Sequence, residues 1–272
     1  RQGSQHRFNG TESFWQALVN RAEKTPAARR LALELAVIHS ETCHLSNEQV
    51  IRLFEKSQGD AASLFYLWQI LQSAGYVDLA DQAAWLALLQ GNFASADLLC
   101  LCEYFLNNKN AHGATTCARY LHTQSELSHA QSIQLGLDLF ELGIPDEAEY
   151  FLQQGVKRLR KKDSPWQQAQ ICLLAIALKL RTYPEIMQQY RLVRQFLENA
   201  LPFHLDVLEC MVEHGEKKEA ADDFLRFDVV NNIANQDGAL SFFAFVLADQ
   251  GEVEKAFEQL EIGFNALGTL PG

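Results

Sequence analysis

The side chains best able to do chemistry in this sequence are its cysteines and histidines. Cys100 and Cys102 are separated by one residue, whereas a zinc hook usually separates its cysteines by roughly two to four. Cys43 has only an adjacent histidine, and His112 and Cys117 share one expected helix without a second pair of ligands. Because these spacings do not match a metal site, we interpret the cysteines as small core residues and expect no metal and no other cofactor.

One basic run could bind an anion, and its cations are Lys157, Arg158, Arg160, Lys161 and Lys162. Two interpretations remain open. Cations at the C-terminal end of a helix interact with its dipole and stay solvated. Alternatively, the run contacts an acidic partner, a phosphate or a lipid headgroup.

Motifs of nucleophilic or phosphate chemistry are missing from the sequence. There is no Gly-x-Ser-x-Gly, Walker or Gly-x-Gly-x-x-Gly pattern. We therefore expect no catalytic residues and no enzyme activity. Asn9-Gly10-Thr11 fits a glycosylation acceptor, although so short a pattern often arises by chance.

Composition narrows the classes of partner. The 272 residues include 23 basic and 34 acidic side chains, a net charge of −11, so we do not expect binding to nucleic acid. No apolar run reaches the roughly 18 residues of a membrane-spanning helix. Six cysteines in helical patterns favour a reducing compartment. We expect a cytoplasmic location, with the periplasm as the alternative, because a chain that lacks an initiating Met looks like a fragment.

The elements that position these side chains are helices that repeat. A turn residue is followed five positions later by a small or apolar residue at six places: Gly75 and Ala80, Lys109 and Ala114, Gly143 and Ala148, Arg181 and Ile186, Gly215 and Ala220, and Gly251 and Ala256. The intervals between turns are 34, 34, 38, 34 and 36 residues. Glycine can adopt the left-handed conformation that ends a helix, and alanine lets two helices approach closely. The pattern predicts helical hairpins, with an insertion near Lys161 to Pro165.

At these positions the chain resembles the tetratricopeptide repeat (TPR) family. Leu135-Gly136 with Leu139 is the nearest match to the motif of the first helix, and Ala220 with Phe224 keeps the pattern of the second. The family's large residue at the start of the first helix is replaced, for example by His204. The resemblance covers roughly residues 27 to 268. It implies an all-α fold, a right-handed α-solenoid of antiparallel helix hairpins forming a TPR-like superhelix.

We expect four segments along the chain. Residues 1–10 are disordered or form a linker, and residues 11–59 form an N-terminal helix and an atypical end hairpin. Residues 60–268 form six TPR-like hairpins, and residues 269–272 are the tail of a fragment. The last helix is expected to end near Leu267.

In the N-terminal segment we expect a helix from Thr11 to Glu23, followed by a second helix that begins at Pro26. The inner stripe of that second helix is predicted to be Leu31, Leu35 and Ile38. Ser46 is predicted to cap the helix after it, with Glu48 and Gln49 in the first turn.

The resemblance also implies that the first helix of each hairpin lines a concave groove. The corresponding positions are Phe65, Gln69, Leu99, Glu103, Ile133, Leu137, Ile171, Ala175, Leu205, Glu209, Ser241 and Phe245. For each of them the alternative is an ordinary core position. Glu141, Glu213 and Asp249 add negative charge, so the groove suits an amphipathic or mildly basic segment of another protein. Chaperone-tail binding is not expected, because the Lys and Asn that such family members use are missing.

The resulting hypothesis is a protein-protein interaction scaffold within a larger protein or multiprotein assembly. Two alternatives remain. The repeats could be a structural spacer or a dimerisation arm, which implies self-association. They could instead form a regulatory domain of a bacterial secretion or polysaccharide-export system.

Overall fold

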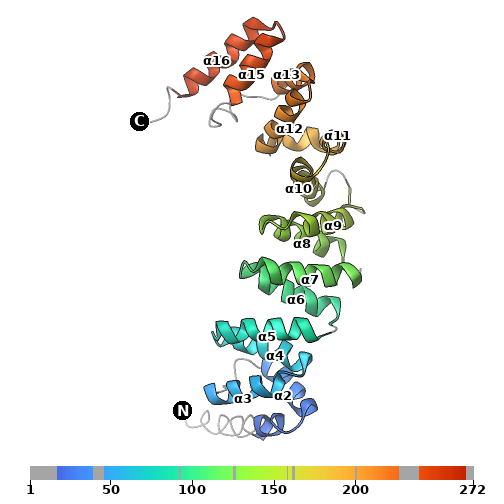
Figure 1. Ribbon diagram of the computed structural model, residues 1–272, viewed down its shortest axis with the longest axis vertical. Helices are drawn as coiled ribbons and strands as arrows, with labels where there is room; N and C mark the ends of the chain where they lie inside the picture. The colour runs from blue at the N-terminus through green and yellow to red at the C-terminus, as the bar shows by residue number, and fades with distance from the viewer. Residues whose placement is uncertain are drawn as a thin grey trace, which may run out of the picture. The chain divides into compact units, whose positions relative to one another are not determined.

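The computed structural model describes residues 17–38, 46–91, 93–124, 127–157, 159–160, 163–199, 201–226 and 239–267. These residues form helices joined by short connections, and no strand occurs among them (Figure 1). The predicted all-α class is therefore confirmed. The chain divides into two compact units, residues 1–126 and residues 127–272, each of which is described by itself.

Unit 1 contains the hairpins α4/α5 and α6/α7, preceded by two helices that pack on α4. Its elements are α2 (Pro26–Ile38), α3 (Asn47–Ser57), α4 (Ala61–Ser73), α5 (Val77–Gln90), α6 (Ser95–Asn107) and α7 (Ala111–Gln124). Residues 17–22 are also helical. The expected helix from Thr11 otherwise lies outside the described residues.

Among its described residues, unit 2 has four pairs of neighbouring helices: α8/α9, α10/α11, α12/α13 and α15/α16. Its elements are α8 (His129–Glu141), α9 (Pro145–Val156), α10 (Ser164–Leu180), α11 (Tyr183–Val193), the 3-10 helix η1 (Arg194–Asn199), α12 (Leu201–Glu213), α13 (Lys217–Arg226), α15 (Ala239–Asp249) and α16 (Val253–Leu267). Helix α16 extends to Leu267, the last residue that the structure describes, so the predicted end near Leu267 stays a prediction.

Five of the six predicted turn residues adopt the left-handed conformation, with φ between 55° and 88°: Gly75, Lys109, Gly143, Gly215 and Gly251. After each of them, the next amide donates to a carbonyl five residues back, as Tyr76 does to Leu71 at 2.9 Å. Arg181 differs, because its φ is −116° and α11 instead begins with a capping box between Thr182 and Glu185.

The small or apolar residues five positions after the turns are all buried: Ala80, Ala114, Ala148, Ile186, Ala220 and Ala256. They lie in the first turns of the second helices, where the two helices of a hairpin approach each other. The repeat period read from the sequence therefore marks real packing contacts.

The 38-residue interval corresponds to one extra helical turn. Helix α10 has 17 residues, whereas α4, α6, α8 and α12 have 13 each. The helix begins with Ser164 and Pro165, within the region where an insertion was predicted. The added turn carries Trp166, which is buried and packs edge-on against Phe196 of η1 at 6.1 Å.

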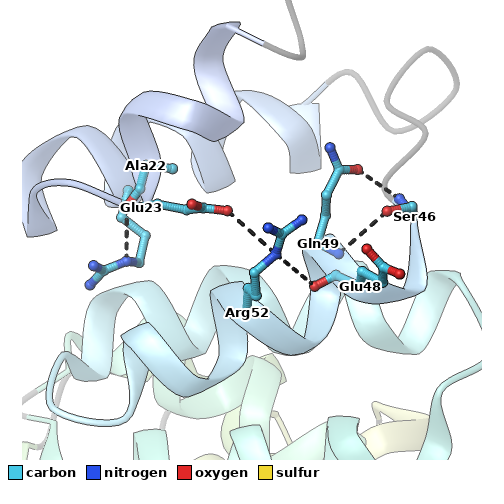
Figure 2. A network of polar contacts seen from close by, with 7 residues as sticks. Ala22, Glu23, Ser46, Glu48, Gln49 and Arg52 are labelled. Carbon is cyan, nitrogen blue, oxygen red and sulfur yellow. Dashed lines mark hydrogen bonds and ion pairs between the residues drawn. The ribbon is translucent and has the colours of Figure 1, made fainter.

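The N-terminus of α3 carries the predicted cap. Figure 2 shows Ser46 facing Gln49, whose side chain and backbone complete a capping box with Ser46. The amide of Ser46 donates to Gln49 Oε1 at 2.8 Å. Arg52 lies between Glu23, 3.6 Å away, and the carbonyl of Glu48, 3.3 Å away. It thereby links α3 to the turn that precedes α2.

The predicted inner stripe of α2 is wrong. Leu31 and Ile38 are 55% and 65% exposed, and Leu35 is only half-buried. The buried face is Arg29, Ala32, Leu33 and Ala36. This stripe has the same helical spacing but a different phase, and its small alanines let α2 lie close against α4.

Neighbouring hairpins in unit 1 meet through aromatic rings. Trp68 of α4 contacts Tyr104 of α6 with ring centroids 5.1 Å apart, and Trp85 of α5 contacts Phe105 at 5.2 Å. The hydroxyl of Tyr104 also donates to Asp81 Oδ1 at 2.5 Å. This aromatic junction joins the hairpins α4/α5 and α6/α7.

A polar network fills the corresponding junction between α10/α11 and α12/α13 of unit 2. The hydroxyl of Tyr190 donates to Asp223 Oδ2 at 2.8 Å and lies 3.0 Å from His204 Nε2. Arg194 of η1 forms an ion pair with Asp223. Tyr190, His204 and Asp223 are at most 2% exposed, so the network lies inside the unit.

Candidate partner-binding surface

The first helices α8, α10 and α12 form a continuous layer in unit 2, because α10 contacts both of the others. The effect of a charge on α8 on a thiol of α10 also indicates that these two helices are neighbours. Burial, and then the charge of Glu141 on α8, raise the pKa of Cys172 on α10 to about 11. We call the solvent-facing side of α8, α10 and α12 the first-helix surface of unit 2.

The predicted groove residues of unit 2 divide into two groups. Leu137 and Ile171 are half-buried, Glu209 and Ser241 are exposed, and Phe245 is 72% exposed. The buried members are Ile133, Ala175 and Leu205. Only the first group offers side chains that a partner could contact.

The burial of Ile133 has a clear packing cause. A Cβ atom on Gly155 of α9 would lie 2.3 Å from Cγ1 of Ile133, so the glycine makes room for this isoleucine. Gly136 plays a similar part, since its added Cβ would meet Leu152 at 2.7 Å. Helix α8 therefore turns these positions toward α9, whereas Leu137 stays half-buried.

The predicted positions of unit 1 lie on α4 and α6. Gln69 and Leu99 are half-buried and Glu103 is exposed. Phe65 is only 6% exposed, and its ring packs against Trp68 at 5.5 Å and Phe93 at 5.4 Å. Unit 1 therefore offers fewer apolar contacts on this side than the sequence indicated.

Three carboxylates lie along the exposed side of α12. Asp206, Glu209 and Glu213 are spaced by three and four residues, which places them on one helix face. Desolvation raises the pKa of Asp206, and desolvation followed by the charges of Asp206 and Glu213 raises the pKa of Glu209. In the part of unit 2 that the structure describes, none of the three forms an ion pair. A cationic group from a ligand would relieve this repulsion.

Asp206 was not found from the sequence, although its place one helical turn before Glu209 could have revealed it. Likewise, Phe242 lies one turn before Phe245 on α15 and is 36% exposed. Between them Phe243 is buried and stacks on Phe224 of α13 at 4.2 Å. Phe243 thus anchors α15, while Phe245 extends into solvent.

The basic run begins where α9 ends at Val156. Lys157 is exposed and donates to Gln154 Oε1 at 2.7 Å, and the amide of Arg160 donates to Asp163 Oδ2 at 3.0 Å. Arg158, Lys161 and Lys162 lie outside the described residues. The described cations thus follow a helix C-terminus, where positive charge is favourable.

Comparisons with known proteins find similar folds among solved structures. No protein-family model matches the chain, and no curated protein matches it. A solved structure of PilF from Pseudomonas aeruginosa is similar over 86% of this chain and 99% of that chain, with 16% identity and a TM-score of 0.38. The fold assignment therefore depends on the helices and turns described above.

The described residues also bear on metal and membrane sites. No group of three or more His, Cys, Asp or Glu side chains in the described ranges is placed to hold a metal ion. Within the same ranges, every helix is too short or too polar to cross a membrane. No disulfide joins the cysteines of the described ranges, which are Cys100, Cys102, Cys117, Cys172 and Cys210. Cys43 lies outside the described part.

Proposed function

We propose that the first-helix surface of unit 2 binds a segment of another protein that combines apolar and basic residues. The observation that carries this proposal is the row of Asp206, Glu209 and Glu213 on α12. None of the three forms an ion pair within the described residues, and desolvation acts on Asp206 and Glu209. The same layer carries the half-buried side chains of Leu137 and Ile171. Phe245 on α15 adds a further apolar contact in the same unit.

The proposed mechanism is burial of the segment on a preformed helical surface. Because the helices pack against each other without the ligand, little conformational entropy is lost on the side of this protein. The acidic row attracts the basic residues and selects against acidic segments. The function is thus binding without catalysis. The lack of a disulfide among the described cysteines fits the expected cytoplasmic location.

The matched control comes from unit 1. Glu103 on α6 and Glu209 on α12 each lie six residues before a turn residue, Lys109 and Gly215 respectively, and both are exposed. The change Glu103→Gln therefore removes one carboxylate at the equivalent position outside the proposed surface. The test variant combines Glu209→Gln with Glu213→Gln, which keeps the shape of both side chains.

The experiment is a titration with a synthetic amphipathic peptide of leucine and lysine. Hydrogen exchange of the α12 amides, measured by mass spectrometry, reports occupancy of the surface. We expect the peptide concentration at half-protection of α12 to rise about tenfold in the double variant. Removing two surface charge pairs costs about 1.4 kcal/mol of binding free energy. Glu103→Gln should leave this concentration unchanged. An unchanged concentration at half-protection in a folded double variant would refute the proposed surface.

A further inference from the structure

The second helices have one face that packs on the next hairpin. Six residues after the turn residue, Asp81 of α5 accepts a hydrogen bond from Tyr104 of α6. At the same position in α9, Glu149 accepts one from Arg181, which precedes α11, at 2.5 Å. The equivalent residues of α11 and α13, Met187 and Ala221, are each 4% exposed. This position therefore marks the side of a second helix that contacts a following helical layer.

In α16 the equivalent residue is exposed. Phe257 lies six residues after Gly251 and is 67% exposed, and Val253, one turn earlier, is 46% exposed. A phenylalanine so open to water leaves most of its apolar area unburied. We call Val253, Glu254, Phe257 and Glu261 the α16 outer face.

Negative charge surrounds this apolar centre. Glu254, Glu258 and Glu261 are exposed, and none of them forms an ion pair within residues 239–267 or the other described ranges. The one lysine of α16, Lys255, already pairs with Glu252 at 3.1 Å. The α16 outer face thus presents an aromatic side chain flanked by unpaired carboxylates.

We propose that the α16 outer face docks an amphipathic α-helix of another protein, with apolar residues over Phe257 and lysine or arginine residues against the carboxylates. A helix fits because α9 and α13 each pack on a helix of the following hairpin, α10 and α15 respectively. A basic helix fits because the chain carries a net charge of −11. A second copy would bring like charges together at this face. This surface differs from the first-helix surface and does not depend on it.

The test follows the α16 amides by hydrogen exchange during a titration with the leucine-lysine peptide. Phe257→Glu should raise the peptide concentration at half-protection of α16 at least about tenfold, because it replaces the apolar contact with the leucine residues by a carboxylate that is costly to bury beneath them. Phe257→Leu should keep it within about threefold, since an apolar side chain remains. Phe257 is exposed in the structure, and thermal melts of the two variants check that they fold.

The control separates the two surfaces. The double variant Glu209→Gln with Glu213→Gln should raise the peptide concentration needed to half-protect the α12 amides. It should leave the concentration needed for the α16 amides unchanged. A leucine-glutamate peptide should not protect α16. The proposal is overturned if Phe257→Glu leaves α16 protection unchanged. It is also overturned if sedimentation shows a dimer that Phe257→Glu dissociates while the peptide gives no protection, since a second copy would then be the occupant.

Discussion

In unit 1 the junction between α4/α5 and α6/α7 is aromatic, whereas the junction between α10/α11 and α12/α13 in unit 2 contains buried charge. Both use a tyrosine hydroxyl that donates to an aspartate, Tyr104 to Asp81 at 2.5 Å and Tyr190 to Asp223 at 2.8 Å. Their surroundings differ. Asp81 is half-buried, but Asp223 is 1% exposed and pairs with Arg194.

The difference shows that a shared helical period allows two chemistries between hairpins. Rings at the junction of unit 1 contribute buried area and tolerate a partly hydrated carboxylate. In unit 2 a fully buried carboxylate is stable only with its partners in place, because an uncompensated buried charge is costly. The junction of unit 2 should therefore be the more sensitive to single substitutions and to acid.

The largest expected effect comes from removing the two aspartates. Asp223→Ala should destabilise unit 2 by about 3–5 kcal/mol, because it leaves the Arg194 charge and the Tyr190 hydroxyl without their partner. Asp81→Ala should cost about 1 kcal/mol in unit 1, where water can replace the lost bond. Hydrogen exchange of each unit in rising urea measures both, with Asp222→Ala as the exposed control. Equal losses in the two units would contradict the comparison.

Acid should also distinguish the units. Burial, and then the charge of Arg194, lower the pKa of His204 to about 4, below its ordinary 6.5. The unfolded chain then binds the proton more readily than the folded chain between these two values. Stability of unit 2 is therefore complete above pH 6.5 and falls by up to about 3 kcal/mol as the pH drops toward 4.

The measurement for this acid effect is unfolding of each unit at pH 7 and pH 4.5. The described histidines of unit 1, His112 and His122, are exposed, in contrast to the buried His204 of unit 2. His204→Gln should reduce the pH dependence of unit 2 while keeping a side chain that can bond to Tyr190. A steeper acid loss in unit 1 would disagree with this account.

The turns offer a smaller comparison. In unit 1, Lys109 adopts a left-handed φ of 55°. In unit 2, the described turn residues with positive φ are all glycines. Lys109→Gly should stabilise unit 1 by up to about 1 kcal/mol, because glycine avoids the left-handed strain. Gly215→Ala should destabilise unit 2 by about 1–2 kcal/mol, since a Cβ there meets no atom within 4 Å and only the backbone is strained. Melting temperatures of the two variants check the opposite signs.

The smallest expected effect concerns a surface contact of unit 2. Arg181→Ala removes the ion pair with Glu149, whose side chains are 42% and 18% exposed. We expect a loss below about 1 kcal/mol, because solvent screens such a pair. Chemical denaturation in low and high salt would show it, with the difference vanishing at high salt. A loss as large as that of Asp223→Ala would mean that surface pairs govern unit 2.

The turns were predictable because their requirement is local. A left-handed residue favours glycine, and four glycines set a period that also located Lys109. The phase of the α2 stripe was not predictable, since Leu31 and Ala32 both lie on acceptable helical faces and only α4 decides between them. Tyr190, His204 and Asp223 were missed for the same reason, because only the packing of three helices brings these distant positions together.

The groove shows where family resemblance ends. Leu137 and Ala175 each lie six residues before a turn residue, yet Leu137 is half-buried and Ala175 is 1% exposed. Equivalent places in the repeat therefore differ in exposure, because neighbouring side chains cover them to different extents. The exposure of each predicted groove residue could be read only from the packed structure and not from its place in the repeat.

Site-specific photo-crosslinking tests the central claim most directly. A photo-reactive residue replaces Leu137 of unit 2 in one variant and Gln69 of unit 1 in another, since both lie six residues before a turn residue and are half-buried. Irradiation is done with the leucine-lysine peptide and, separately, in native lysate. The account predicts crosslinked product from position 137 that the Glu209→Gln and Glu213→Gln changes reduce, and little from position 69. Equal products at both positions, or product at position 69 alone, would contradict it.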